Sequence, residues 1–544
     1  MADEKLYIVV TKKGINIDEV EAELERDTDG DASASAHVPG RTVDVAYAKK
    51  FNNRITHYML TDAEAAELSK DSRIHTVSSK ADPETEQLYA VQNAKFDRST
   101  TNSQDAVNWG LKRHILKEYD SAAASNSYTG DYNYSLDGTG VDIVIQDDGV
   151  DPTGHPEWRD AAGNSRFIQL DWNTIIPGCM PATHYSNSDS SGGNANEHGS
   201  HVAGIAAGYT YGWAKNAKIY SVRKFGGSSA INADDVFDCI RVWHENKPID
   251  PNTGFKRPTI VNQSWGYSWY YKNGTFGNAQ MQTLFYQGVN QNITPRVWNS
   301  GDDQYGAVNS RHPMEYTPVD VEQEQLTDAG VICVKAAGNG YHPCAGENAP
   351  YYSGIYDSYY TLDQIWGNVV PIGSPIYYNR PSSPHSNDTI FVANMDEATY
   401  ISDEFITQSS ERGPRIDVIA AGSEISSATS QVSGYGTKQL YPGSSTHYMA
   451  RIGGTSMAAP QICGVGALWL QANPGGTAQQ FKDFLAIHST ATTYDSGTAT
   501  DFESYNSIPR RYGAPNRVLH WPYNSPNPLK YSGTSGSSTP GINT

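Results

Sequence analysis

The stretch that most constrains the fold runs from Gly453 to Gln471, with the sequence GGTSMAAPQICGVGALWLQ. Four of its residues recur at steps of three to four positions, with small Ala and Gly residues between them, which predicts a helix packed closely on its neighbours: Ala458, Ile462, Val465 and Trp469. Pro460 is expected in the first turn, where its missing N–H is tolerated. Ser456 then lies at the helix N-terminus, where unpaired amides and the helix dipole favour negative charge developing beside a hydroxyl. A capping serine is the structural alternative.

Length and charge exclude some classes of protein. The 544 residues can form a large core and suggest two to four domains. Sixty acidic residues against forty basic ones give a net charge of -20, which disfavours nucleic acid and anionic membrane as partners. No segment approaches the roughly 20 apolar residues that cross a bilayer. The opening MADEKLYIVVTKKG lacks the basic and hydrophobic regions of a signal peptide, so we expect a cytoplasmic or particle-associated protein, a virion included.

The cysteines indicate neither a disulfide framework nor a zinc site. There are five, an odd number, and none has CxxC spacing. Three of them lie in apolar contexts and are expected to be core thiols: Cys239, Cys333 and Cys463.

Residues 1–80 form a separate unit in which a strand–helix pattern occurs twice. We expect strands at 5–11, 57–60 and 74–78, and helices at 17–26 and 61–71, with residues 27–40 as a polar loop. Thr61 and Glu64 have the spacing of a capping box. This order predicts a small α+β ferredoxin-like domain. Residues 81–105 are polar and are interpreted as an exposed linker.

From Ala106 onward short β-rich runs alternate with helical stretches. Strands are expected at 141–145, 218–222, 259–261, 331–336, 389–393 and 416–420, and helices at 201–207, 232–245, 321–329 and after Gly454. This alternation predicts an α/β fold with a mostly parallel sheet covered by helices on both faces. Functional residues of such sheets lie beyond the carboxyl ends of the strands.

Three polar residues occupy positions of this kind. Asp147 ends a strand, His198 precedes a helix of small residues, and Asn339 follows a strand and a glycine. Taken singly, each has an ordinary structural explanation: a turn-forming Asp-Gly, a capping or packed histidine, and a left-handed turn residue. Together with Ser456 they supply a base orienter, a base, an oxyanion donor and a nucleophile.

At this point the sequence resembles the subtilisin-like serine proteases, whose chain order is Asp, His, Ser. IQDDGVD is similar to the Asp segment of that family, HGSHVAGIAAG to its His segment, AAGN to its oxyanion segment and GGTSMAAP to its Ser segment. The DDG variant resembles the kexin-type branch. The resemblance covers roughly residues 106–523, with longer stretches than a minimal member needs at 169–196, 266–320, 340–387 and 425–450.

The resemblance implies a serine endopeptidase and assigns roles to residues. Ser456 attacks the peptide carbonyl, His198 takes and returns the proton, Asp147 orients the histidine and Asn339 binds the oxyanion. It assigns Asp148 and His201 to support. The residues expected to bind an extended polypeptide substrate are Ser264, Trp265, Gly266, Ala336, Ala337 and Gly338. Trp265 would wall one pocket, and a core tryptophan is the alternative.

The resemblance also implies that residues 1–80 are a prosegment, an inhibitor and folding aid carried in the same chain. The linker at 81–105 then contains the processing site, and cleavage after Tyr89 is expected from the apolar run Leu88-Tyr-Ala. Residues 524–544, rich in Ser, Gly, Pro and Thr, are expected to be a flexible tail.

No cofactor is needed for the reaction, but the resemblance allows structural calcium. The loops at 250–253 and 300–303 offer oxygen ligands. Solvated acidic loops are the alternative.

Two other classes of function compete with an active protease. One is a latent or inactive subtilase-like component of a larger particle, such as a phage particle, with the first 80 residues still in the groove. The other is an esterase of the α/β-hydrolase type, but those carry the serine in a GxSxG elbow with the histidine last, whereas here the serine stands in GTSMA and comes last.

Overall fold

The computed structural model of the chain describes residues 4–24, 37, 43, 45–47, 53–79, 86–88, 109–115, 134, 136–180, 196–225, 234–251, 253–270, 279–286, 288–297, 311–340, 342, 344, 358–363, 373–396, 404–491, 493 and 511–522. The expected cleavage after Tyr89, the loop at 300–303 and the tail at 524–544 lie outside these residues. The division of the chain at residues 80, 105 and 523 stays a prediction.

The N-terminal unit is a four-stranded antiparallel sheet with two helices. Its elements are β1 (Lys5–Thr11), α1 (Ile17–Leu24), β2 (Val45–Tyr47), β3 (Ile55–Leu60), α2 (Asp62–Leu68) and β4 (Ile74–Ser79). The strand order β2-β3-β1-β4 is that of a ferredoxin-like domain, as expected, although the sequence pattern did not predict β2. The capping box is confirmed: Thr61 accepts from the amide of Glu64, whose carboxylate accepts from the amide of Thr61.

The centre of the molecule is a seven-stranded parallel sheet. Its strands are β6 (Asp142–Asp147), β7 (Phe167–Ile168), β8 (Lys218–Arg223), β9 (Thr259–Gln263), β14 (Ile332–Ala336), β17 (Ile390–Met395) and β18 (Val418–Ala421). They lie in the order β18-β17-β14-β9-β6-β8-β7, and every pairing is parallel. All six expected strands are present, and the short edge strand β7 is an addition. From β6 the chain first adds strands on one side, β7 and β8, and then on the other side, beginning with β9. Open α/β sheets bind their ligands at such a change of direction.

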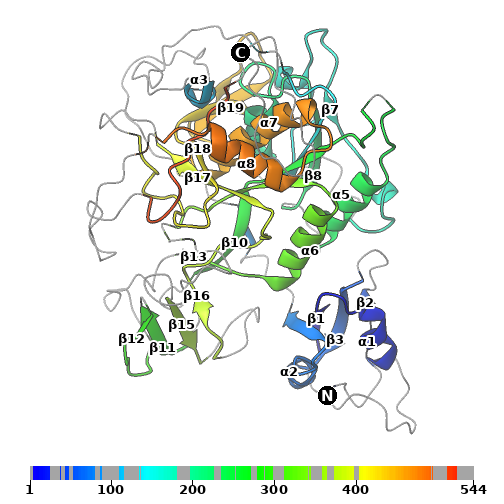
Figure 1. The fold of residues 1–544 in the computed structure, drawn as a ribbon, viewed down its shortest axis with the longest axis vertical. Coiled ribbons are helices and arrows are strands. Elements are labelled where there is room, and N and C mark those ends of the chain that lie inside the picture. Colours follow the sequence, from blue (N-terminus) through cyan, green and yellow to red (C-terminus); the bar gives the residue numbers. More distant parts are fainter. Residues whose placement is uncertain are drawn as a thin grey trace.

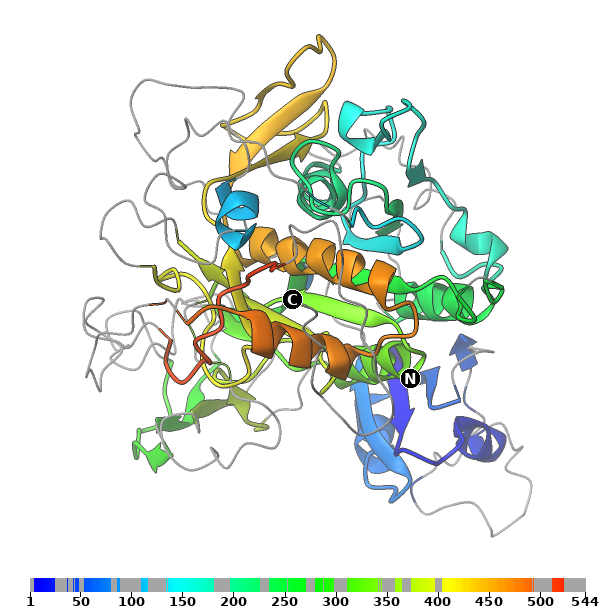
Figure 2. The same ribbon diagram turned by 45° about the horizontal axis from the view of Figure 1, so that its top comes forward.

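Helices cover both faces of this sheet (Figures 1 and 2). The helices are α3 (Trp109–Ile115), α4 (Glu197–Ala207), α5 (Asp235–Glu245), α6 (Thr317–Asp328), α7 (Thr455–Ala472) and α8 (Ala478–His488). Along β6, Ile143 and Ile145 join the core that contains α4 and α7, whereas Val144 joins the core that contains α5 and α6. This alternation is what a strand buried on both faces requires. Both α3 and α8 are additions to the expected helices.

The long stretches between core elements form smaller sheets. One combines β13 (Arg311–Pro313), β10 (Trp265–Tyr270) and β5 (Glu86–Leu88); a second combines β12 (Val289–Asn290), β11 (Met281–Tyr286), β15 (Tyr359–Leu362) and β16 (Ile376–Tyr377); a third combines β19 (Ile425–Thr429), β21 (Tyr448–Ile452) and β20 (Gln439–Leu440). Two 3-10 helices, η1 (Pro156–Trp158) and η2 (Trp172–Thr174), complete the described elements. The first of these sheets adjoins the candidate site.

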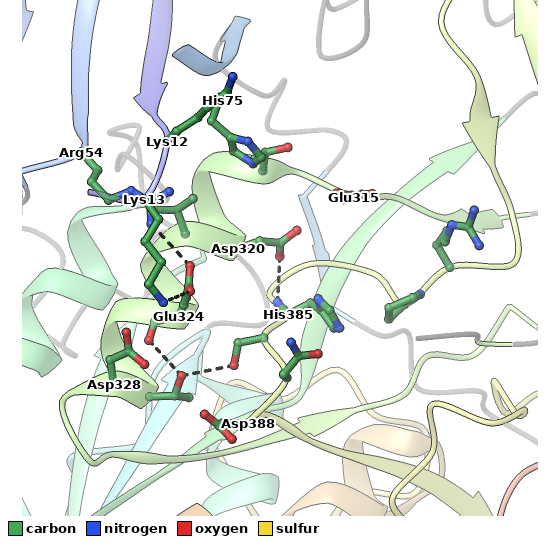
Figure 3. A pocket seen from close by; sticks show the side chains of 17 residues that line it. Lys12, Lys13, Arg54, His75, Glu315, Asp320, Glu324, Asp328, His385 and Asp388 are labelled. Atoms are coloured by element: carbon green, nitrogen blue, oxygen red, sulfur yellow. Dashed lines mark hydrogen bonds and ion pairs between the residues drawn. The ribbon is translucent and has the colours of Figure 1, made fainter. Parts of the chain in front are cut away.

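The N-terminal sheet packs against α5 and α6, and ion pairs cross the interface. A cavity of about 740 Å³ lies between the N-terminal unit and α6 (Figure 3). Lys13 Nζ lies 3.0 Å and Arg54 Nη1 3.5 Å from the Glu324 carboxylate of α6. Deeper in the interface, His57 Nε2 lies 3.2 Å from Asp234 Oδ2, and both side chains are buried. The interface therefore combines an exposed charged rim with a buried polar pair.

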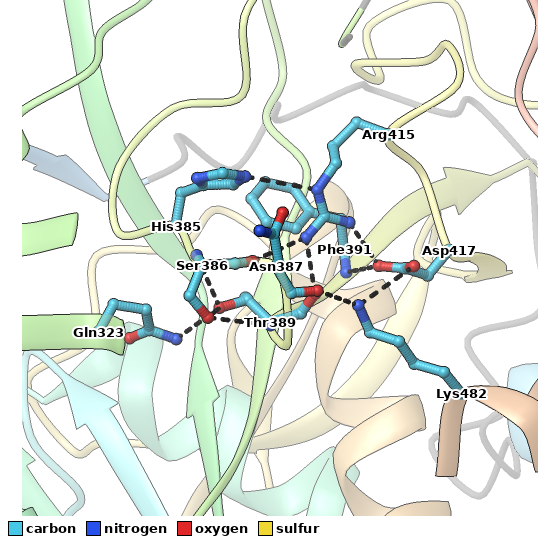
Figure 4. A network of polar contacts seen from close by, with 9 residues as sticks. All are labelled: Gln323, His385, Ser386, Asn387, Thr389, Phe391, Arg415, Asp417 and Lys482. Atoms are coloured by element: carbon cyan, nitrogen blue, oxygen red, sulfur yellow. Dashed lines mark hydrogen bonds and ion pairs between the residues drawn. The ribbon is translucent and has the colours of Figure 1, made fainter. Parts of the chain in front are cut away.

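A polar network fastens the loop before β17 to its surroundings (Figure 4). Arg415 donates to the carbonyls of Ser386 and Thr389 at 3.0 and 2.8 Å and to the Asp417 carboxylate at 2.7 Å. Lys482 of α8 donates to the carbonyl of Asn387 at 2.7 Å. These contacts join α8 and the residues that precede β18 to this loop.

Within the described part of the chain, no helix combines the length and apolar character that crossing a bilayer requires.

Candidate active site

Asp147 is the last residue of β6 and is fully buried. One of its carboxylate oxygens, Oδ1, accepts the amide of Asp148 at 2.8 Å. The same oxygen lies 2.8 Å from Nδ1 of His198, the second residue of α4. The strand end and the helix start thus meet in a buried carboxylate–imidazole pair.

The carboxylate determines the ionisation of His198. Burial opposes protonation of the ring, but the charge of Asp147 and its hydrogen bond outweigh burial, so the pKa of His198 is raised above its usual value. With Nδ1 turned to Asp147, Nε2 is the nitrogen left to handle a proton, and among the described residues it has no hydrogen-bond partner.

Asp148 explains why α4 begins where it does. Its carboxylate accepts the amides of His198 at 3.1 Å and of Gly199 at 2.7 Å, while the residue at the cap position, Asn196, makes no side-chain capping bond. A Cβ on Gly199 would lie 2.1 Å from the carbonyl oxygen of Gly149, so only glycine fits there. Burial and then the neighbouring Asp147 charge raise the pKa of Asp148 to about 7. Asp148 therefore holds the helix that carries His198.

His201 faces another part of the molecule. Its Nε2 lies 3.1 Å from the carbonyls of Ile425 and Ala450, which belong to the sheet of β19 and β21. Burial lowers the pKa of His201 to about 3, so the ring is neutral. The hydrogen bonds of His201 therefore support this sheet.

Ser456 is the second residue of α7 and is fully buried. Its Oγ donates to the carbonyl of Ser264 at 3.2 Å, and Ser264 Oγ donates back to the carbonyl of Ser456 at 2.8 Å. The expected place of Pro460 was wrong: it is the sixth residue of α7 and lies inside the helix. A proline there cannot donate to the carbonyl four residues earlier, which is that of Ser456. Ser264 satisfies the carbonyl that Pro460 leaves without a helical donor.

The two strand ends that hold these side chains are neighbours. In the parallel pair β6–β9, Ile145 lies opposite Asn262, so the two strands end side by side, β6 at Asp147 and β9 at Gln263, the residue before Ser264. His198 is bonded to the first strand end and Ser456 to the second. The sheet register therefore brings the three chain segments to one edge, with the Ser456 hydroxyl turned toward Ser264.

Asn339 joins the same edge from β14, the strand next to β9. Its Oδ1 accepts from the amide and the hydroxyl of Thr455 at 3.0 and 3.1 Å, and the Thr455 hydroxyl accepts the amide of Gly338 at 3.2 Å. Because Thr455 holds the oxygen end, the donor end Nδ2 lies beside Gly454, 3.4 Å from where a Cβ on that glycine would be. The Asn339 amide group thus lies beside Gly454, two residues before Ser456, with its oxygen bonded to Thr455.

The residues expected to bind substrate lie on strands that border this edge. Ala336 and Ala337 are buried at the end of β14, and Gly338 adopts a positive φ of 124°. Gly266 lies in β10, which pairs antiparallel with β5, so that Gln87 is opposite Gly266. A segment of this chain therefore lies along the strand that we expected to bind substrate.

Trp265 is fully buried and contacts the rings of Phe225, Phe237 and Tyr267, at centroid distances of 5.4, 6.2 and 5.8 Å. These contacts agree with the core tryptophan that sequence reasoning held as the alternative. Its role as a pocket wall stays a prediction.

Calcium also stays a prediction. Among the described residues no group of three or more His, Cys, Asp and Glu side chains has the arrangement of a metal site. The loop at 250–253 is described except for residue 252, and the loop at 300–303 lies outside the described residues.

Two contributors were missed by sequence reasoning: the Ser264 hydroxyl and Thr455. The proline four residues after Ser456 could have indicated the role of the Ser264 hydroxyl, because a proline in a helix leaves the carbonyl four residues earlier without a helical donor. The Thr455 contact to Asn339 joins positions 116 residues apart and left no local signal.

The fold and this site define an α/β protein of the serine hydrolase class. The model of the subtilase family matches residues 138–514, more than half of the chain, and the chain belongs to that family. It is a subtilisin-like serine protease, and polypeptide is its class of substrate.

Individual relatives are distant in sequence. A cuticle-degrading serine protease of Arthrobotrys oligospora is 23% identical over 424 residues, 78% of this chain and 70% of the relative. Subtilisin-like protease 3 of Arthroderma benhamiae is 24% identical over 495 residues, 91% of this chain and 88% of the relative. Among solved structures, a cold adapted subtilisin-like serine proteinase matches 76% of this chain and 98% of its own at 20% identity, with a TM-score of 0.42. Fervidolysin from Fervidobacterium pennivorans matches 95% and 60% at 18% identity, with a TM-score of 0.48.

Proposed function

We propose that this protease hydrolyses peptide bonds through Asp147, His198 and Ser456 and is made as a self-inhibited precursor. The observation that carries the catalytic part is the buried 2.8 Å contact between Asp147 and His198, at a strand end directly beside the one that holds Ser456.

The reaction begins when the Ser456 hydroxyl turns from the Ser264 carbonyl toward Nε2 of His198. Nε2 takes the proton as Oγ attacks the substrate carbonyl, and later gives it to the leaving amine. Asp147 keeps the proton of His198 on Nδ1 and stabilises the imidazolium. Asn339 Nδ2 and the N-terminal amides of α7 bind the oxyanion. No metal or other cofactor is assigned a part in these steps, and calcium is proposed only as a structural ion.

Inhibition by the N-terminal unit is supported by two contacts. Its sheet packs on α5 and α6, and β5, which follows it in the chain, pairs with β10. An extended peptide gains affinity by adding a strand to a sheet edge, and a segment of the same chain competes at high effective concentration. While β5 occupies β10, a substrate cannot pair there.

An activity-based probe tests the catalytic part. A fluorophosphonate should label the wild-type protein after the N-terminal unit is removed, and should not label Ser456→Ala. Ser445→Ala, which changes an exposed serine of a loop, is the matched control and should label as the wild type does. Labelling of Ser456→Ala would refute the assignment of the nucleophile. No labelling of any variant would favour the latent particle component.

Mass mapping tests the precursor separately. Wild-type protein should be cut between residues 80 and 105, whereas Ser456→Ala should remain whole if the chain processes itself. A wild-type chain that labels with the probe but is never cut would leave the triad standing and refute self-processing.

A further inference from the structure

Two cysteines from distant parts of the chain meet in the core beneath the N-terminal unit. Cys179 lies in the turn that follows η2, and Cys239 lies in α5. They are 60 positions apart, yet their sulfur atoms are 2.7 Å apart. This is within about 0.7 Å of the roughly 2.05 Å of a disulfide bond. Both side chains are buried, and in this structure both are thiols.

The surroundings hold both cysteines in place. The turn is folded on itself, because the amide of Cys179 donates to the carbonyl of Ile176 at 3.1 Å, and that of Met180 donates to Asn173 Oδ1 at 3.1 Å. Trp172 of η2 packs edge-on against Trp243 of α5 at a ring distance of 5.7 Å. The contact between the sulfurs is therefore part of a packed junction between the turn and α5.

The remaining cysteines provide the contrast. Cys333 lies in β14, Cys463 in α7 and Cys344 near Lys335, and all three are buried thiols. No sulfur–sulfur contact is found for them among the described residues, whereas Cys179 and Cys239 touch.

We propose that Cys179 and Cys239 form a disulfide when the chain folds under oxidising conditions, and that this bond fastens the turn after η2 to α5. Because α5 also packs beneath the N-terminal sheet and contacts Trp265 through Phe237, the bond would stiffen the support of both. The proposal does not depend on the catalytic assignment.

The chemistry needs a two-electron oxidant, for which a small disulfide such as oxidised glutathione suffices. The thiolate of one cysteine attacks the small disulfide, forms a mixed disulfide and releases one small thiol. The thiolate of the other cysteine then attacks the protein sulfur and releases a second small thiol. The two cysteines lose two protons and two electrons, and the small disulfide is reduced to two thiols.

The order of events follows from burial. Burial, together with the contact with Cys179, raises the pKa of Cys239 well above its usual value, so the folded chain holds little of its thiolate. Both side chains are buried once α5 has packed. The bond should therefore form during folding rather than in the finished protein.

The test counts thiols in full-length protein carrying Ser456→Ala, which removes self-digestion. After refolding with oxidised glutathione and unfolding without reductant, three of the five cysteines should react with a thiol reagent, and all five after reduction. Non-reduced digestion should yield one linked pair of peptides, containing Cys179 and Cys239.

Two variants sharpen the count. Cys239→Ser leaves four cysteines and should show four reactive thiols, because the pair is broken. Cys463→Ala also leaves four but should show two, because it keeps the pair. Reduction should lower the apparent midpoint of thermal unfolding by on the order of 5 °C in Cys463→Ala and leave Cys239→Ser unchanged. Five reactive thiols after oxidative refolding, a glutathione adduct in place of the link, or a link between other cysteines would overturn the proposal.

Discussion

At the scale of single residues, the site depends on how buried polar atoms share partners. Asp147 gives one oxygen to both the amide of Asp148 and the ring of His198, and Asp148 gives its carboxylate to the helix that carries that ring. Ser264 and Ser456 exchange hydrogen bonds between strand and helix. Each of the side chains proposed for catalysis in this group is thus held by a hydrogen bond to a neighbouring residue.

Replacing Asp147 with Asn tests the carboxylate. The amide cannot stabilise the imidazolium, so kcat should fall by roughly 10⁴-fold, the loss found when other serine proteases lose this carboxylate. The base must be neutral to act, so activity rises with pH through the pKa of His198. Because the Asp147 charge raises that pKa, the variant should lose activity only at lower pH than the wild type does. Full pH–rate profiles of both proteins measure this. If both proteins lost activity at the same acid pH, the charge of Asp147 would not be what raises the pKa of His198.

Replacing Asn339 with Ala tests the oxyanion donor. One such donor contributes roughly 10²–10³ in kcat, a magnitude measured in subtilisin itself. We expect a loss of that size in kcat with little change in KM, because the hydrogen bond strengthens as the carbonyl becomes an oxyanion. Steady-state kinetics on a peptide substrate decide this. Asn339 also binds Thr455, so a loss confined to KM would indicate that the side chain only shapes the site.

At the scale of elements, close packing between α4 and α7 controls how their N-termini meet. A Cβ on Gly464 of α7 would lie 2.6 Å from the carbonyl oxygen of Ala206 in α4 and 2.6 Å from Cβ of Trp213. The close approach of α4 and of Trp213 therefore explains why a glycine stands at position 464 of α7.

Gly464→Ala should destabilise the protein although alanine favours helices. Overpacking costs about 1–3 kcal/mol, against a helix-propensity gain of up to about 1 kcal/mol. Denaturant unfolding in the Ser456→Ala background should show the net loss. Gly436→Ala is the matched control, because no atom lies within 4 Å of its new methyl group. Equal stability of the two variants would show that α7 can move away from α4 at no cost.

At the scale of the whole molecule, the N-terminal unit is attached by contacts of different strength. The ion pairs of Glu324 with Lys13 and Arg54 are at the surface and screened by salt, whereas His57 and Asp234 are buried. Burial of an apolar face that includes Ile8 and Val10 contributes a further, non-directional attraction between the N-terminal unit and the rest of the chain. Attachment should therefore depend more on the buried pair than on the more numerous exposed charges.

Asp234→Ala should loosen the N-terminal unit while Glu324→Gln should change it little. Leaving one member of a buried polar pair without its partner costs about 1–3 kcal/mol, which corresponds to roughly 5- to 150-fold easier opening. Amide hydrogen exchange of β1 and β3 in the full chain with Ser456→Ala measures the opening, and exchange of β6 and β9 is the internal control. Faster exchange in Glu324→Gln than in Asp234→Ala would reverse this ranking.

The sequence by itself determined the parallel α/β core, the ferredoxin-like unit, the capping box at Thr61 and the four residues proposed for catalysis, because periodicity, caps and short motifs act within about twenty residues. Only the tertiary structure decided that β6 and β9 end side by side, that Ser264 satisfies the carbonyl freed by Pro460, that β5 pairs with β10 and that Cys179 touches Cys239. Those contacts join positions from 60 to nearly 200 residues apart. They arise from strand order and helix packing, which no local pattern encodes.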